Sequence, residues 1–299
     1  MSTEDVDPRY AALDSWGTPK VVAAMYEGQL AAAAAVQPAL AAIARAVDGA
    51  AAVLRRGGGR IVYVGAGTSG RVGVQDGTEL VPTFQWPEER LLFLMAGGMA
   101  ALTRSAEGAE DSEADGARAV AEANIRPGDV VIGIAASGTT PYTVGALRAA
   151  QAAGAVTIGI ANNPDTPLLQ TARHAVLLRT GGEAIAGSTR MKAATAQKIA
   201  LNLFSTALMV KLGRVYRGLM VHMRATNAKL RRRAAGIVTR ITGCPPEEAA
   251  RFVEQAEGDV KIAILLALGA SRAEAASLLE RHDGHLRAAI GGIHPGKNG

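Results

Sequence analysis

Short apolar runs alternate with helical patterns through the middle of the chain. Five runs of aliphatic and β-branched residues, each bounded by Gly, Asp or Asn, are typical of buried strands and occupy positions 60–64, 91–95, 130–135, 155–161 and 174–178. Helical patterns at 72–80, 113–123 and 142–152 separate them. Regular alternation of strand and helix predicts an α/β fold, a parallel sheet with right-handed crossovers and helices on both faces.

Long helical patterns flank the predicted sheet, at 21–55 and 188–212. The Ala-rich part of the first contains a proline and charges of both signs, so it predicts a pair of amphipathic helices rather than a membrane span. After the sheet, three short helices are expected at 245–255, 259–268 and 272–281. We therefore expect an N-terminal helical segment over residues 1–57, an α/β domain over 58–238 and a helical domain over 239–299.

The composition fits this organisation and suggests a cellular setting. The chain has 299 residues, of which 48% are hydrophobic but only 4% aromatic, so aliphatic side chains must fill the core. Its single cysteine, Cys244, excludes an intramolecular disulfide and any cysteine cluster for a metal. The acidic start of the chain lacks the apolar core of a secretory signal. We expect a cytoplasmic protein.

The net charge of +5 does not by itself indicate a nucleic-acid partner. The densest basic run, at 229–233, has no aromatic residues nearby on which bases could stack, so it predicts a solvated helix face or helix end. The five histidines are scattered, and none has carboxylate or cysteine partners at metal-ligand spacing. We expect no metal, no nucleic acid and no membrane partner.

Two loops rich in glycine and hydroxyl residues follow the first and third predicted strands. The first contains Gly65, Gly67, Thr68, Ser69 and Gly70, and the second is the run Ser-Gly-Thr-Thr-Pro at 137–141. Such turns direct backbone N–H groups, hydroxyls and a helix N-terminus at one point, which suits a phosphate. Both loops lie at the carboxyl edge of the predicted sheet, where ligands of this fold bind.

Other interpretations of these loops remain open. The first has the Gly-x-Gly-x-x-Gly spacing of dinucleotide sites, but no acidic residue follows the second strand to hold a ribose. It could also be a tight structural turn. The hydroxyls of the second loop could cap the helix that Pro141 opens. We favour a phosphorylated small molecule as the ligand.

Charged residues near these loops are further candidates. Glu79 lies on the helix after the first loop, and Glu110 belongs to an acidic block, 107–112, just before another helix. In the block Gly-Ser-Thr-Arg-Met-Lys at 187–192, the long helix is expected to start at Ser188 or Thr189, with Arg190 and Lys192 near the site. By composition alone, exposure or helix capping is the default interpretation of the acids, and the cations could equally be solvated.

These blocks together closely resemble the N-acetylmuramic acid 6-phosphate etherases, which belong to the sugar isomerase (SIS) superfamily of phosphosugar-binding domains. The resemblance covers about residues 60 to 290 and is carried by the blocks 65–71, 76–79, 107–112, 134–142, 187–192, 195–198 and 225–229. It implies a three-layer αβα domain with a five-stranded parallel sheet, a small three-helix C-terminal domain resembling ubiquitin-associated (UBA) domains, and a homodimer with sites near the subunit interface.

The resemblance also implies a reaction, cleavage of the lactyl ether at C3 of the sugar to give N-acetylglucosamine 6-phosphate and D-lactate. Opening the sugar ring exposes an aldehyde that acidifies the C2 proton. A base removes that proton, lactate leaves with help from an acid, and water adds to the unsaturated product. Such a route needs two acid–base groups and no cofactor.

By the same resemblance, Glu79 is the acid that protonates departing lactate, and Glu110 is the second acid–base group. Glu79 must then keep its proton near neutral pH, through burial or a nearby anion. The residues expected to hold the phosphosugar are Gly67, Thr68, Ser69, Ser137, Gly138, Thr139, Thr140, Ser188 and Lys192, with Glu183 and Arg190 as further candidates.

Two departures from the family pattern stand out. The segment 3–7 lacks the usual Thr-Glu-x-x-Asn run, and Ala135 stands where many sugar-phosphate isomerases have the first Ser of Ser-x-Ser-Gly. One phosphate contact of those isomerases is therefore expected to be missing or supplied elsewhere. Two alternatives remain open, a non-catalytic sugar-phosphate regulator similar to the glucokinase regulatory protein, and an aldose–ketose phosphate isomerase with Glu183 as its base.

Overall fold

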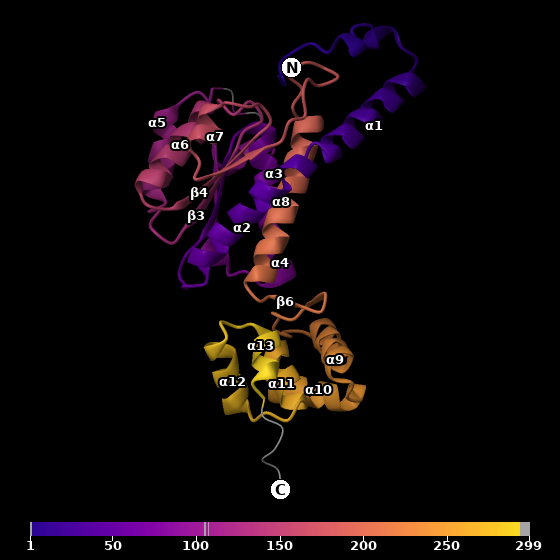
Figure 1. Cartoon of the computed structure of the whole chain (residues 1–299), viewed down its shortest axis with the longest axis vertical. Coiled ribbons are helices and arrows are strands. Elements are labelled where there is room, and N and C mark those ends of the chain that lie inside the picture. Colours follow the sequence, from indigo (N-terminus) through magenta and orange to yellow (C-terminus); the bar gives the residue numbers. More distant parts are fainter. Residues whose placement is uncertain (1, 105, 107, 294–299) are drawn as a thin grey trace. The chain divides into compact units, whose positions relative to one another are not determined.

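The computed structural model describes residues 2–104, 106 and 108–293 (Figure 1). They fall into two compact units, each considered by itself below. Unit 1 comprises Met1–Glu79 and Pro87–Ala207, and unit 2 comprises Leu80–Trp86 and Leu208–Gly299. Residues 208–238 thus group with the C-terminal helices, although we expected them with the sheet. The three-domain division at 57/58 and 238/239 stays a prediction.

Unit 1 is built on a five-stranded parallel sheet. Its strands are β1 (Ile61–Gly65), β2 (Leu91–Met95), β3 (Val130–Ile134), β4 (Val156–Ala161) and β5 (His174–Leu177). Their order across the sheet is β2-β1-β3-β4-β5, and all neighbours pair in parallel. Every residue of β1, β3 and β4 is buried, as expected for aliphatic strands covered on both faces. The predicted sheet is confirmed, with strand ends that differ by at most one residue.

Helices cover both faces of this sheet (Figure 1). Helices α5 (Glu113–Glu122), α6 (Pro141–Ala152) and α7 (Pro167–Thr171) lie on one face, and α2 (Leu40–Leu54), α3 (Gly67–Thr78) and α8 (Lys192–Lys211) lie on the other. Short 3₁₀ turns η4 (Glu88–Arg90) and η5 (Met99–Leu102) flank β2. The three-layer αβα architecture implied by the resemblance is therefore confirmed.

Helix α3 begins five residues earlier than the apolar pattern predicts. We expected it to start at residue 72, where the aliphatic residues begin, but its first turn already includes Gly67 and Gly70. A Cβ atom on Gly70 would lie 2.4 Å from the Met95 sulfur and 2.9 Å from the Gly65 carbonyl carbon. The glycine is needed because the helix starts in direct contact with strand β1.

The N-terminal part of unit 1 contains 3₁₀ turns η1 (Pro8–Tyr10) and η2 (Leu13–Ser15), followed by the expected helix pair. Helices α1 (Thr18–Ala34) and α2 are separated by the 3₁₀ turn η3 (Gln37–Ala39). The stretch Thr18–Leu54 is long and apolar enough, by length and composition, to cross a membrane. However, α2 buries Ile43, Val47 and Leu54 beneath the sheet, as a core helix does.

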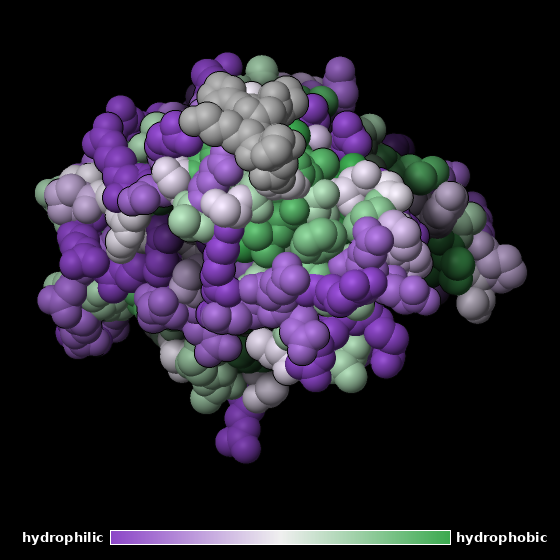
Figure 2. Space-filling model, turned by 90° about the horizontal axis from the view of Figure 1, so that it is seen from below, coloured by the Kyte–Doolittle hydropathy of each residue, from purple (hydrophilic) through white to green (hydrophobic). Residues whose placement is uncertain are grey.

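Unit 2 is mainly helical. It contains α4 (Leu80–Phe84), the two-stranded hairpin β6 (Val215–Tyr216) and β7 (Leu219–Met220), α9 (Ala228–Thr242), α10 (Pro246–Gln255), α11 (Val260–Ala267), α12 (Arg272–Arg281) and α13 (Leu286–Gly291). Helices α10, α11 and α12 are the three that we expected. In the view of Figure 2, apolar residues show at the centre of a mostly hydrophilic face. The UBA-like character of this region stays a prediction.

The basic run at 229–233 lies in the first turns of α9, whose bounds the sequence pattern did not predict. Asn227 accepts a hydrogen bond from the Leu230 amide and so caps its start, and Gly243 ends it in the left-handed conformation. The lysine and three arginines of the run are exposed, while Ala234 and Val238 face the core. The interpretation of this run as a solvated helix face is confirmed.

Candidate active site

The two hydroxyl-rich loops follow neighbouring strands of the sheet. Strand β1 pairs with β3 over its whole length, and Gly65 lies opposite Ile134 at their carboxyl ends. The strand order reverses direction between β1 and β3, and open α/β sheets bind their ligands at such a point. The predicted placement of both loops at one edge is thus confirmed.

The first loop turns directly into the N-terminus of α3. Ala66 occupies the cap position, and no side chain caps the helix there. The first N–H groups of a helix have no partner within it, and together with the helix dipole they attract an anion. Thr68 is half-buried and Ser69 is buried at this end of the helix. This arrangement can accept a phosphate.

No hydroxyl of the second loop caps the start of helix α6. Thr140 precedes α6 but makes no side-chain cap hydrogen bond, and the Ser137 hydroxyl accepts a hydrogen bond from the Thr139 amide at 3.2 Å. The amide of Tyr142 instead donates to the Glu110 carbonyl oxygen at 3.0 Å. The capping interpretation is therefore wrong for Thr140, because the acidic loop supplies the acceptor for the first turn of α6.

Gly138 in this loop cannot carry a side chain. Its φ is 74°, and a Cβ atom there would lie 2.3 Å from the Thr166 hydroxyl oxygen. Its role is thus to let the loop turn close to the segment that follows β4.

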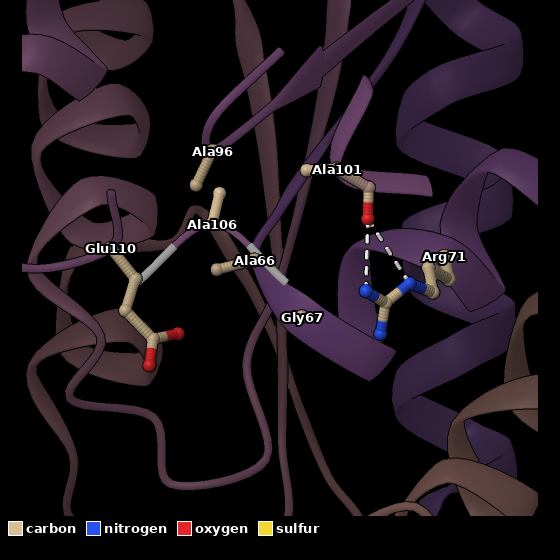
Figure 3. A pocket seen from close by; sticks show the side chains of 7 residues that line it. All are labelled: Ala66, Gly67, Arg71, Ala96, Ala101, Ala106 and Glu110. Atoms are coloured by element: carbon tan, nitrogen blue, oxygen red, sulfur yellow. Dashed lines mark hydrogen bonds between the residues drawn. The ribbon is translucent and has the colours of Figure 1, made fainter. Parts of the chain in front are cut away.

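A cavity of about 220 Å³ opens beside the first loop (Figure 3). Glu110 lies on one side of it and Arg71 on the other, and the remaining lining residues are Ala66, Gly67, Ala96, Ala101 and Ala106. The Glu110 side chain is exposed, so its carboxyl group is accessible from solvent. Glu107, of the same acidic block, lies outside the described residues. The structure therefore brings Glu110 and Gly67 together.

Glu79 does not line this cavity in a single chain. It occupies the C-cap position of α3. Gly67 lies twelve residues earlier, at the other end of this helix, which is a distance of about 18 Å. Helix α3 runs back along the sheet, since Gly70 contacts Gly65 while Gly77 lies against the rings of Tyr63 and Phe93. The Glu79 side chain is exposed. The burial that we expected for it is absent within one chain.

A buried carboxyl group anchors the end of α3 from which Glu79 extends. Asp76 accepts hydrogen bonds from Tyr63 (2.8 Å), Asn202 (2.6 Å) and Ser205 (3.1 Å). Burial raises the pKa of Asp76, and these three hydrogen bonds oppose that rise. The network ties the end of α3 to β1 and α8.

Glu183 caps helix α8. Its buried carboxylate accepts hydrogen bonds from the amides of Lys192 and Ala193, both at 2.9 Å. The expected start of this helix at Ser188 or Thr189 is wrong, because residues 187–191 form tight turns. The helix begins only at Lys192, where the carboxylate accepts the first free backbone N–H groups. Both oxygens of Glu183 are engaged, which argues against a role as a free base.

The other residues expected in this region differ in exposure. Ser188 is half-buried and Arg190 is exposed, while Lys192 is buried and its stem packs against Gly28 of α1. The Arg9 guanidinium, and to a smaller extent the charge of Lys192, lowers the pKa of Asp7. Lys192 therefore lies at the junction of α8 with the N-terminal segment.

Asn163 is a residue of this edge that sequence reasoning missed. Its amide nitrogen donates to the Thr3 hydroxyl at 3.0 Å and to the Ser137 carbonyl at 3.4 Å, and its carbonyl accepts from the Thr3 amide at 3.0 Å. The Thr3 carbonyl accepts in turn from the Gly187 amide. The divergent N-terminal segment thus contacts the second loop through Asn163. The signal was available, since Asn163 follows a predicted strand at the same edge.

Within residues 2–104, 106 and 108–293, no three His, Cys, Asp or Glu side chains gather where they could hold a metal ion.

Comparison with known proteins shows relatives that match almost the whole chain. Residues 42–151 match the glucokinase regulatory protein N-terminal SIS domain, and residues 102–207 match the SIS domain. An N-acetylmuramic acid 6-phosphate etherase of Deinococcus radiodurans is 53% identical over 97% of this chain and 95% of its own length. One from Salmonella typhimurium is 46% identical over 97% of this chain and 98% of its own. A phosphoheptose isomerase structure from Francisella tularensis is 15% identical, with a TM-score of 0.48 over 64% of this chain and 98% of that chain.

Proposed function

We propose residue roles from the premise that this chain belongs to the N-acetylmuramic acid 6-phosphate etherase family. It is a carbon–oxygen lyase that removes D-lactate from N-acetylmuramic acid 6-phosphate and leaves N-acetylglucosamine 6-phosphate. The observation that carries the assignment of roles is the cavity between the start of α3 and Glu110. A phosphate at the helix N-terminus would leave the sugar facing this carboxyl group.

The phosphate is bound by the two loops. The N–H groups at the start of α3 and the hydroxyls of Thr68 and Ser69 receive it from one side, and Ser137, Thr139 and Thr140 receive it from the other. Gly67 and Gly138 allow the backbone to approach, and Ser188 and Lys192 extend the site. Such binding, remote from the reacting bond, holds C2 and C3 in place for chemistry.

Glu110 is an acid–base group of the elimination. The open-chain aldehyde makes the C2 proton acidic, and a carboxylate exposed to the cavity can move a proton there. Loss of that proton and departure of lactate from C3 leave an unsaturated aldehyde, to which water adds at C3. The lactate oxygen must receive a proton as it leaves, and this is the role that we assign to Glu79.

Glu79 reaches the site from a second subunit. In one chain it lies about 18 Å along α3 from Gly67, too far for both glutamates to act on one C2–C3 bond. Helix α1 exposes Val22, Tyr26 and Leu30, which are 60%, 63% and 54% exposed and recur every four residues. This apolar stripe fits a second copy of the chain, and we propose that Glu79 enters the partner's site in that homodimer.

We also propose a cytoplasmic location, which the lone cysteine and the phosphorylated substrate support.

The test is lactate release from N-acetylmuramic acid 6-phosphate by the wild-type protein and by Glu110→Gln. We expect stoichiometric lactate from the wild type and a kcat lower by at least about 1000-fold in the variant, with the dissociation constant for N-acetylglucosamine 6-phosphate unchanged. Near-normal turnover by Glu110→Gln would remove Glu110 from the mechanism. Tight phosphosugar binding without lactate from the folded wild type would point to a regulator instead.

A further inference from the structure

Arg71 clamps the chain segment that leads to Glu110. It lies in the second turn of α3, and its guanidinium group reaches across to the end of η5 (Figure 3). Nε donates to the carbonyls of Leu102 at 3.1 Å and Ala101 at 3.2 Å, and Nη2 donates to the carbonyls of Ala101 at 2.9 Å and Arg104 at 3.3 Å. One side chain thus binds three carbonyl groups of residues 101–104.

These bonds connect the two halves of the proposed site. Arg71 comes four residues after Gly67 on the same helix, and residues 101–104 lie on the path from β2 to Glu110. A planar guanidinium presents its N–H groups in a fixed fork, which sets direction as well as distance. Hydrogen bonds from a charged donor are also about twice as strong as neutral ones. The phosphate-binding helix therefore holds the acidic loop directly.

The far end of the acidic loop is held separately. The Glu110 carbonyl accepts the Tyr142 amide at the start of α6. Between the two attachments the loop packs on Gly97, where a Cβ atom would lie 2.5 Å from that of Ala106. The loop is thus fixed at Arg71, at Gly97 and at Tyr142, and only the first of these attachments is a side chain that can be replaced without altering the backbone.

We propose that Arg71 is a positioning residue, which holds residues 101–104 so that Glu110 faces C2 and C3 of the bound sugar. The inference rests on the proposed role of Glu110. A displacement of about 1 Å in a reacting group can reduce a rate about 100-fold, so loss of this clamp acts on the chemical step while the phosphate contacts persist.

The same side chain could instead contact the substrate. It lines the cavity, and the lactyl group carries a carboxylate that an arginine could bind. The reaction product has no lactyl group, so the two roles predict different behaviour toward substrate and product. A positioning residue affects kcat and the mobility of the loop, whereas a carboxylate contact affects the affinity for substrate alone.

The experiment compares Arg71→Met, which keeps the length of the stem but removes the donors, with Arg71→Lys. For Arg71→Met we expect kcat to fall about 100-fold while KM changes less than about threefold. Backbone amides of residues 99–104 should exchange with deuterium at least about tenfold faster. Arg71→Lys should recover about tenfold in kcat, because an ammonium group binds fewer carbonyls at once. Arg148→Met removes an exposed arginine, paired with Glu113, and should change nothing.

One result would assign Arg71 to the lactyl carboxylate and overturn the inference: in Arg71→Met, KM for the substrate rises at least about 30-fold while kcat and the affinity for the product are unchanged. Unaltered kcat and unaltered exchange would overturn it as well. If Glu110→Gln retains wild-type turnover, the role of Glu110 fails first and this inference fails with it. An inactive Glu110→Gln beside a fully active Arg71→Met overturns the role of Arg71 alone.

Discussion

Glu183 and Glu110 are both acidic residues of loops at the carboxyl edge of the sheet, yet their surroundings differ. Glu183 is buried, and both of its oxygens accept backbone N–H groups of α8. Glu110 is exposed to a cavity, with only its carbonyl group tied to α6. The hydrogen bonds of Glu183 make it a helix cap and disfavour an isomerase with Glu183 as base, whereas the side chain of Glu110 is open to the cavity, as the acid–base role that we propose requires.

The hydroxyls of the second loop give a direct test of phosphate binding. Replacing Ser137 and Thr140 together with Ala should raise KM for N-acetylmuramic acid 6-phosphate at least about 30-fold and leave kcat nearly unchanged, because two hydrogen bonds to a charged phosphate are lost. Thr140 does not cap α6, so the fold should be retained. Ser277→Ala, on the exposed surface of α12, serves as the control. An unchanged KM would show that these hydroxyls do not contact the ligand.

The sequence identifies some of these residues and cannot identify others. Thr68 and Ser137 each lie three residues beyond the end of a strand, so their place at the sheet edge follows from the pattern alone. Arg71 is different, because its partners are backbone carbonyls of residues 101–104, brought to it only by the path of the acidic loop. Main-chain partners leave no mark in the types of residue along the chain.

The strands, and the starts of α5 and α12, are predicted almost to the residue, whereas the starts of α3 and α8 are not. Strands β1 and β3 are uninterrupted apolar runs, and burial on both faces makes such runs clear in the sequence. Helix α3 starts earlier than its apolar residues, since glycines allow contact with β1. Helix α8 starts later than its hydroxyl residues, since its cap comes from Glu183, nine residues upstream. Distant contacts decide these ends.

Unit 2 contains a buried histidine, His222, whose protonation makes stability depend on pH. His222 follows β7, and burial, with the charges of Arg214 and Lys261, lowers its pKa from 6.5 to about 3. Burial also lowers the pKa of Lys261, to about 8, although Asp259 opposes this, and its ammonium group donates to the Gly284 carbonyl at 2.6 Å. In the folded protein His222 thus stays neutral where the unfolded chain takes up a proton.

Acidification should therefore destabilise unit 2 through His222. Below about pH 6.5, His222 takes up a proton in the unfolded state but not in the folded state. The free energy of unfolding therefore falls as the pH is lowered from about 6.5 to about 3, and by pH 5 the loss is about 2 kcal/mol. We expect His222→Gln to lack this loss. Urea unfolding of both proteins at pH 7.5 and pH 5 measures it. Equal losses in the wild type and the variant would mean that His222 is not held neutral by the fold.

The proposed roles of Glu79 and Glu110 depend on the proposed homodimer. The family resemblance pointed to both, but no local pattern gives the distance between them, and one chain leaves Glu79 at the opposite end of α3 from the first loop. The exposed stripe of Val22, Tyr26 and Leu30 on α1, and Leu203 on α8, are apolar surface of unit 1 that a second copy could cover. The proposed site is therefore complete only in the dimer.

Mixed dimers of Glu79→Gln and Glu110→Gln test this most directly. Co-expression with two different affinity tags allows the heterodimer to be isolated, and the two parent homodimers serve as inactive controls. If each site takes Glu79 from one subunit and Glu110 from the other, the heterodimer holds one intact site and one that lacks both glutamates. We predict lactate release at about half the wild-type rate per dimer. A heterodimer as inactive as its parents would mean that both glutamates act from the same chain.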